Sequence, residues 1–131
     1  MKLPVNYTLK NITDPEIDTE SLARRQSLIH TSVIQTLRNL PVGVRALVRS
    51  VRIENNNDHL GFIVTFNLEG TYGSCDPANE TWEHPAVASI DFLREDMKKE
   101  KVVKIMHAAI HDLLTCRLNL VQQHCREMEH L

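Results

Sequence analysis

The sequence predicts an α+β fold in which an antiparallel sheet is followed by C-terminal helices. Two observations support this prediction. Residues 50–54 and 60–69 place apolar and polar side chains in alternation, which is the period of strands with one buried face. Residues 95–129 contain no glycine or proline and repeat apolar side chains at helical spacing, which indicates a long helix. The chain has 131 residues, which is enough for one domain with its own core.

Composition narrows the class of protein. No apolar run approaches the length of a membrane span, and the N-terminus lacks the apolar core of a signal peptide. The three cysteines, Cys75, Cys116 and Cys125, have no metal-binding spacing, which indicates a reducing compartment. The net charge of −2 argues against a general nucleic-acid binder.

Charge is unevenly distributed along the chain. Residues 21–53 contain no acid, whereas residues 54–96 contain nine acids and one base. Such segregation gives either a basic face for a polyanion or solvated faces whose counter-charges lie elsewhere in the fold, and both interpretations stay open. The acid-free stretch holds six arginines: Arg24, Arg25, Arg38, Arg45, Arg49 and Arg52.

The N-terminal third is the most ambiguous part. Residues 3–12 alternate loosely and predict a short strand before a turn. Residues 18–40 permit two interpretations, because their spacing slightly favours a helix while frequent Ser, Thr, Val and Ile suit strands. Residues 41–43 end either element. The helical face would contain Leu22, Ile29, Val33, Leu37 and Leu40.

The clearest local pattern is a hairpin around a polar turn at residues 55–58. A polar loop at residues 70–85 follows, and residues 86–93 predict a third strand with Ala88, Ile90 and Phe92 on one face. The buried face of the hairpin is predicted to hold Val51, Ile53, Leu60, Phe62, Val64, Phe66 and Leu68.

The C-terminal helix carries two apolar stripes. One stripe is enough to cover a sheet, so two imply a second partner surface in this chain or in another copy. A continuous helix over residues 95–129 would be about 50 Å long. It must therefore bend near Cys116 or cross a subunit boundary, and both favour an intertwined homodimer. The stripes are Val102, Met106, Ala109, Leu113 and Leu120, and Val103, Ile110, Leu114, Leu118, Val121, Cys125 and Met128.

No motif predicts an enzyme, since phosphate loops, nucleophile elbows and dinucleotide fingerprints are absent from the sequence. The acids Asp76, Glu80 and Glu83 are better explained by a solvated loop than by an acid–base pair. His107 and His111 have a spacing that can hold zinc, but no third ligand is evident. We therefore expect no cofactor, metal, membrane or small-molecule partner.

The second face of the hairpin is polar. Hydroxyl, amide and arginine groups on a rigid sheet can bind a base by hydrogen bonds and its phosphate by charge. A solvated sheet face is the alternative interpretation. The residues on this face are Ser50, Arg52, Gly61, Ile63, Thr65 and Asn67, with Ser89 and Asp91 on the last strand.

This order of elements resembles the coat proteins of single-stranded RNA bacteriophages, the levivirus-like family, and the Q-beta branch in particular. The resemblance rests on residues 2–12, on the GSCDP motif within residues 70–77, and on the polarity of residues 88–114. It covers most of the chain and fits its length.

The resemblance implies a sheet made of an N-terminal hairpin over residues 1–43 and a three-strand meander over residues 44–93. Residues 18–40 would then be strands. Helices in residues 94–131 would cover a partner subunit in an intertwined dimer. Dimers would form an icosahedral capsid that packages single-stranded RNA in the host cytoplasm, so the expected location is the virion.

The resemblance also implies two sites. The interior sheet face would bind RNA, including an RNA hairpin whose binding represses translation. The loop after the hairpin would contact neighbouring subunits. The implied RNA-binding residues are Arg49, Ser50, Arg52, Ile63, Thr65 and Asn67, with Val48 as a further position on that face. The implied inter-subunit contacts are Gly73, Ser74, Cys75, Asp76 and Pro77.

If residues 18–40 are helical, a different function follows. The order helix, hairpin, strand, helix is typical of a small α+β module that binds RNA or joins a phage head to its tail. Lys98, Lys99 and Lys101 resemble the basic start of the last helix in double-stranded-RNA-binding domains.

Overall fold

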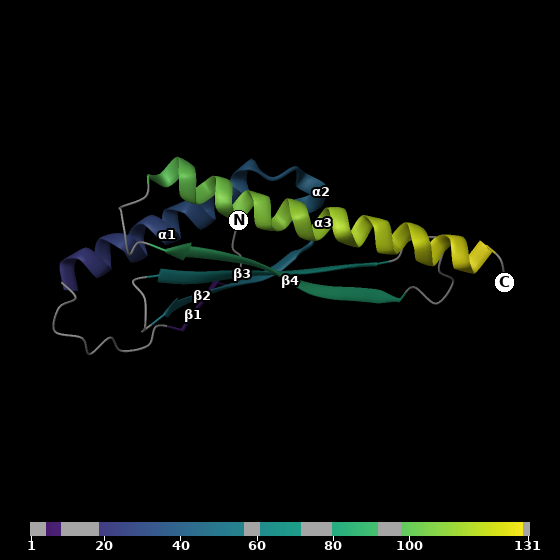
Figure 1. The fold of residues 1–131 in the computed structure, drawn as a ribbon, viewed down its shortest axis with the longest axis horizontal. Coiled ribbons are helices and arrows are strands. Elements are labelled where there is room, and N and C mark those ends of the chain that lie inside the picture. Colours follow the sequence, from purple (N-terminus) through teal and green to yellow (C-terminus); the bar gives the residue numbers. More distant parts are fainter. Residues whose placement is uncertain (1–4, 9–18, 57–60, 72–79, 92–97, 130–131) are drawn as a thin grey trace.

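Two long helices lie over one face of a four-stranded sheet in the computed structural model (Figure 1). The structure describes residues 5–8, 19–56, 61–71, 80–91 and 98–129. In chain order the elements are β1 (Val5–Thr8), α1 (Thr19–Asn39), α2 (Val42–Arg45), β2 (Val48–Asn56), β3 (Gly61–Thr71), β4 (Thr81–Asp91) and α3 (Lys99–Glu129).

The sheet has the order β1-β2-β3-β4. Strands β2, β3 and β4 form an antiparallel meander, with Val51 paired to Phe66 and Phe66 paired to Ala86. Strand β1 pairs with β2 in the parallel direction. The predicted α+β class with an antiparallel meander is therefore confirmed.

The N-terminal third differs from what the coat-protein resemblance implies. Residues 18–40 were expected as strands on that basis, but α1 is a helix that covers almost all of them. The hairpin expected within residues 1–43 is not confirmed, because the one strand described there, β1, pairs in parallel with β2. The helical interpretation of this stretch is the correct one.

Hydroxyl groups explain how a strand-like composition forms α1. The side chains of Thr31, Ser32 and Thr36 donate to backbone carbonyls four residues earlier, at 3.0, 2.6 and 2.8 Å. Ser32 and Thr36 are completely buried, so these local bonds satisfy groups that would otherwise be costly to bury. A helix therefore accommodates the Ser and Thr residues that favoured a sheet in isolation.

The connection from α1 to the sheet contains a short helix, which the sequence did not predict. Pro41 precedes α2, and β2 begins at Val48 rather than near residue 44. The Arg45 side chain donates to the carbonyls of Leu37, Arg38 and Leu40 at 3.0, 3.0 and 3.2 Å. These carbonyls lie at the end of α1, where intrahelical donors run out. Arg45 therefore closes α1 while the chain turns into the sheet.

The core lies between the inner sheet face and the two long helices. It confirms the buried face predicted for the hairpin and the third strand, apart from Leu60 and Phe92, which lie outside the described residues. The described helical residues predicted on the inner face of α1 are also buried. The core comprises Ile29, Val33, Leu37, Leu40, Val48, Val51, Ile53, Phe62, Val64, Phe66, Leu68, Trp82, Ala86, Ala88, Ile90, Val102, Met106 and Ile110.

Helix α3 packs on β4 and on α1 through its first half. Thr36 on α1 contacts the sulfur of Met106 on α3 at 3.7 Å. Figure 1 shows that both helices run in the same direction and that the C-terminal end of α3, in yellow, continues past the end of the sheet. Its 31 residues correspond to about 46 Å.

Strand β4 is longer than predicted. It begins at Thr81, so residues 81–85 belong to the sheet rather than to the polar loop predicted for residues 70–85. Trp82 is buried on the inner face, whereas Glu83, His84 and Pro85 are exposed. Three consecutive exposed residues hide the alternation that would have identified this part of the strand.

Candidate nucleic-acid interface

The open face of the sheet brings together most of the residues predicted to bind RNA. Arg52 is paired with Thr65 across β2 and β3, and Ser50 is paired with Asn67. The Asn67 side-chain amide donates to the Ser50 hydroxyl at 3.0 Å. Ile63 is next to Thr65 on the same face. The predicted platform of hydroxyl, amide and guanidinium groups is therefore present geometrically.

Two positions near the start of β2 depart from the prediction. The pairing of β2 with β3 shifts register between Val48 and Ser50, as in a β-bulge. Val48 is consequently buried, with 3% of its surface exposed, and does not lie on the open face as expected. Arg49 lies at the bulge and remains exposed.

Both arginines of this site are paired with acids. Arg49 Nε lies 3.3 Å from Glu69 Oε2, and Arg52 Nη1 lies 3.5 Å from Glu54 Oε1. These pairs are solvent-exposed and add little to stability. They do reduce the positive potential that a phosphate would meet on this face.

The open face as a whole is acidic. Besides Glu54 and Glu69, strand β4 contributes Glu83 and Asp91, and both are exposed. Glu83 lies directly across from Glu69. Four carboxylates therefore share this face with Arg49 and Arg52. The arginines of residues 21–53 divide between the helix layer and the sheet, so they do not form a single basic face.

The basic groups gather on the helix layer instead. On α1, the described residues from 23 to 39 include arginines and no acid. The start of α3 has exposed Lys98, Lys99, Lys101 and Lys104, with Glu100 as the acid among them. Among the described residues, the helix layer therefore carries a net positive charge and the open sheet face a net negative charge.

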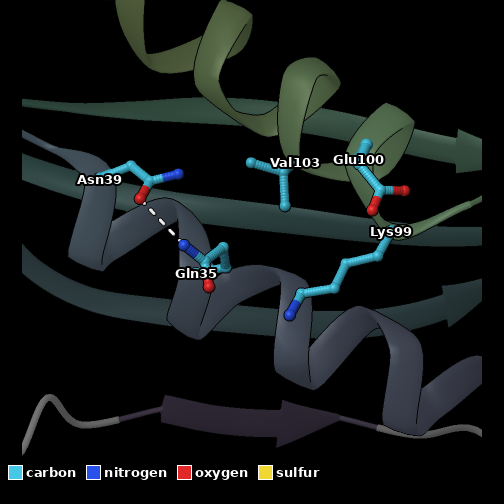
Figure 2. Close-up of a pocket in the computed structure, with 5 residues that line it drawn as sticks. All are labelled: Gln35, Asn39, Lys99, Glu100 and Val103. Atoms are coloured by element: carbon cyan, nitrogen blue, oxygen red, sulfur yellow. Dashed lines mark hydrogen bonds between the residues drawn. The ribbon is translucent and has the colours of Figure 1, made fainter.

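A shallow groove of about 390 Å³ lies between α1 and α3 (Figure 2). Gln35 Nε2 donates to Asn39 Oδ1 at 2.9 Å on its α1 side. Lys99, Glu100 and Val103 line the α3 side. Sequence reasoning named Lys99 and Val103 for other reasons and missed Gln35 and Asn39, although their spacing of four would place these two side chains together once α1 is taken as a helix.

The remaining candidate sites are the inter-subunit loop and the histidine pair. The residues of the predicted inter-subunit loop, Gly73 to Pro77, lie outside the described residues. His107 and His111 are both exposed on α3. Within the described ranges, no three His, Cys, Asp or Glu side chains come close enough to hold a metal ion. No helix in those ranges is both long and apolar enough to cross a bilayer.

Comparisons with known proteins identify no relative. The chain matches no protein-family model, no curated protein and no solved structure at a significant level.

Proposed function

We propose that this chain is a structural protein of the coat type, which assembles with copies of itself into the shell of an RNA-containing virion. The observation that carries the proposal is the length of α3. Among the α3 side chains that the structure describes, Leu114 is the last apolar one packed on the core, and the helix continues to Glu129. The remaining 15 residues correspond to about 22 Å of helix.

The sequence of this C-terminal arm, residues 115–129, favours a partner surface. Leu118, Val121 and Cys125 continue the helical spacing that begins at Leu114. Every side chain described in the arm is exposed, namely Thr115, Cys116, Gln123, Arg126 and Glu127. An apolar stripe on an arm that passes its own sheet (Figure 1) is best satisfied by a second copy of the chain.

The meander gives further support. Strands β2, β3 and β4 precede one long helix, which is the order that the coat-protein resemblance implies. The GSCDP motif lies between β3 and β4, where that resemblance puts a loop that contacts other subunits. The proposal keeps these elements and gives up the N-terminal hairpin, because α1 is helical.

Single-stranded RNA is the proposed cargo. Because the open face is acidic, charge does not favour phosphate there. The proposal therefore assigns RNA contact to hydrogen bonds from Ser50, Thr65 and Asn67, which occur on a rigid part of the sheet. Arg49, Arg52 and Ile63 would flank this polar centre.

A second candidate function is favoured by α1. With a helix at residues 19–39, the element order resembles a small RNA-binding or head–tail connector module. The lysines at the start of α3 and the absence of acids from residues 23–39 of α1 suit a contact with duplex RNA backbone. This candidate has no need for the α3 arm.

The decisive experiment expresses the chain alone and combines size-exclusion chromatography with electron microscopy. The coat-type proposal expects uniform hollow particles that carry host RNA, and a dimer as their building unit. Leu118→Asp with Val121→Asp should abolish both, whereas the matched control Thr115→Asp with Gln123→Asp, at exposed positions, should not. A monomer that binds duplex RNA and forms no particles would contradict the proposal and favour the second candidate.

A further inference from the structure

The helix layer and the open sheet face of the molecule carry net charges of opposite sign. The helix layer is basic and the open sheet face is acidic, as described above. A face of one sign attracts a partner face of the other sign and repels its own kind. The chain is therefore suited to contact a second copy through unlike faces rather than like ones.

On the helix layer, α1 presents a regular exposed stripe, which we call the α1 stripe. Its members recur every three or four residues, so they share one side of the helix. Ile34 is an exposed apolar residue within it, with 37% of its surface accessible. Along the axis it lies about 6 Å from Arg38 and about 15 Å from Arg24. The stripe consists of Arg24, Ser27, Thr31, Ile34 and Arg38.

The open sheet face carries a matching arrangement. Val87 is exposed at its centre, with 52% of its surface accessible, and lies across from Thr65. Ile63 is two residues from Thr65 along β3, which is about 7 Å, and its partner Glu54 on β2 lies two strands, about 10 Å, across the sheet from the strand of Val87. The pair Glu69–Glu83 is four residues away in the other direction, which is about 13 Å.

We infer that the α1 stripe of one copy docks on the open sheet face of the next copy. Ile34 would cover Val87, Arg38 would face Glu54, and Arg24 would face Glu69 and Glu83. Glu54 and Glu83 lie on opposite sides of Val87 at similar distances of about 12 and 13 Å, so the opposite charges of the two surfaces, rather than their spacings, carry the match. An apolar centre with a charged rim is the usual anatomy of an interface between proteins.

This contact rests on the proposed self-assembly and adds to it a second interface, separate from the α3 arm. It joins two different surfaces, so repeated docking gives a ring or an open stack rather than a closed pair. RNA and the α1 stripe would occupy the same face. The contact therefore belongs to copies that have not bound RNA, and RNA should release it.

The test uses two charge-reversal variants whose defects are complementary. Arg24→Glu with Arg38→Glu makes the α1 stripe acidic, and Glu54→Lys with Glu83→Lys makes the sheet face basic. Each variant alone should associate at least about tenfold more weakly than the unmodified chain, because like charges then face each other. An equimolar mixture should recover association, since each stripe again meets an opposite face. Sedimentation velocity at low salt measures all three samples.

Controls separate this contact from folding and from the α3 arm. Lys98→Glu with Lys104→Glu makes the same change in net charge as the α1 variant, outside both the stripe and the α3 arm, and should leave association unchanged. Tryptophan fluorescence of Trp82 and the melting temperature report folding. If a double variant does not fold, Arg38→Gln and Glu83→Gln are milder replacements. In addition, salt should weaken association of the unmodified chain, because it screens the charges.

Several results would overturn the inference. These are unchanged association of either folded variant, a mixture that does not recover, or an unmodified chain that forms nothing larger than a dimer. A charge-reversal variant that no longer stacks but still forms a dimer would support the inference and agree with a dimer held by the α3 arm. Stacking that survives Leu118→Asp with Val121→Asp would support the inference while contradicting the proposed arm.

Discussion

Gly70 lies directly across from Trp82 in the β3–β4 ladder, and the indole ring of Trp82 lies over the space where a Gly70 side chain would be. A Cβ atom at Gly70 would come within 2.5 Å of Cζ2 of Trp82. The tryptophan is 8% exposed, so the glycine lets a large ring close this end of the core. The glycine at position 70 of β3 therefore leaves room for Trp82 to pack near the start of β4.

Gly70→Ala is expected to destabilise the protein by about 1–3 kcal/mol, because the rigid indole must move out of a packed site. Urea unfolding followed by Trp82 fluorescence measures the change. Gly43→Ala is the matched control, since nothing lies within 4 Å of the added methyl group and alanine suits the short helix α2 better. Equal effects at both positions would show that the contact with Trp82 is unimportant.

Met106→Ala is expected to cost about 2–5 kcal/mol, because Met106 is fully buried and the change leaves a cavity. The cavity would open between α3 and α1, next to Thr36. Chemical denaturation measures the loss, and His107→Ala, at an exposed neighbouring position, should stay within about 0.5 kcal/mol. A small effect of Met106→Ala would mean that α1 and α3 do not pack on each other.

The accuracy of the sequence predictions followed the strength of local periodicity. The hairpin was predicted well because one strict alternation places Phe62, Val64 and Phe66 in the core. Residues 18–40 stayed ambiguous because Ser and Thr are frequent there and suit strands. In the structure the hydroxyls of Ser32 and Thr36 donate to backbone carbonyls of the same helix, which composition does not reveal. The family resemblance favoured strands for these residues, but in the structure they form a helix whose apolar face packs into the core.

The sequence predicted which candidate residues share one sheet face, but it did not predict the charges around them. Ser50, Thr65 and Asn67 share a face as expected, since alternation along a strand determines which residues do so. The pairing of Arg49 with Glu69 depends on a bulge and on the register of two strands, neither of which is visible in one sequence. The net charge and ion pairs of a sheet face can therefore be determined only once the register of its strands is known.

Arg45→Ala is expected to destabilise the protein by about 1–2 kcal/mol, because it removes donors from carbonyls at the end of α1. Thermal unfolding followed by circular dichroism should show the decrease. Arg38→Ala provides a control of the same residue type, because Arg38 is exposed on the α1 stripe. If the two substitutions are equivalent, Arg45 does not close the helix.

Glu54→Gln with Glu69→Gln is expected to strengthen binding of single-stranded RNA. The change removes the carboxylates paired with Arg52 and Arg49 and leaves both guanidinium groups able to meet phosphates. Each arginine that gains a phosphate contact should steepen the dependence of log affinity on log salt by about 0.7. Filter binding at several salt concentrations measures this slope. Asp112→Asn with Glu127→Gln, at exposed positions of α3, controls for the change in net charge. An unchanged slope would mean that RNA does not meet the open sheet face, and RNA contact would then have to be sought on the basic helix layer.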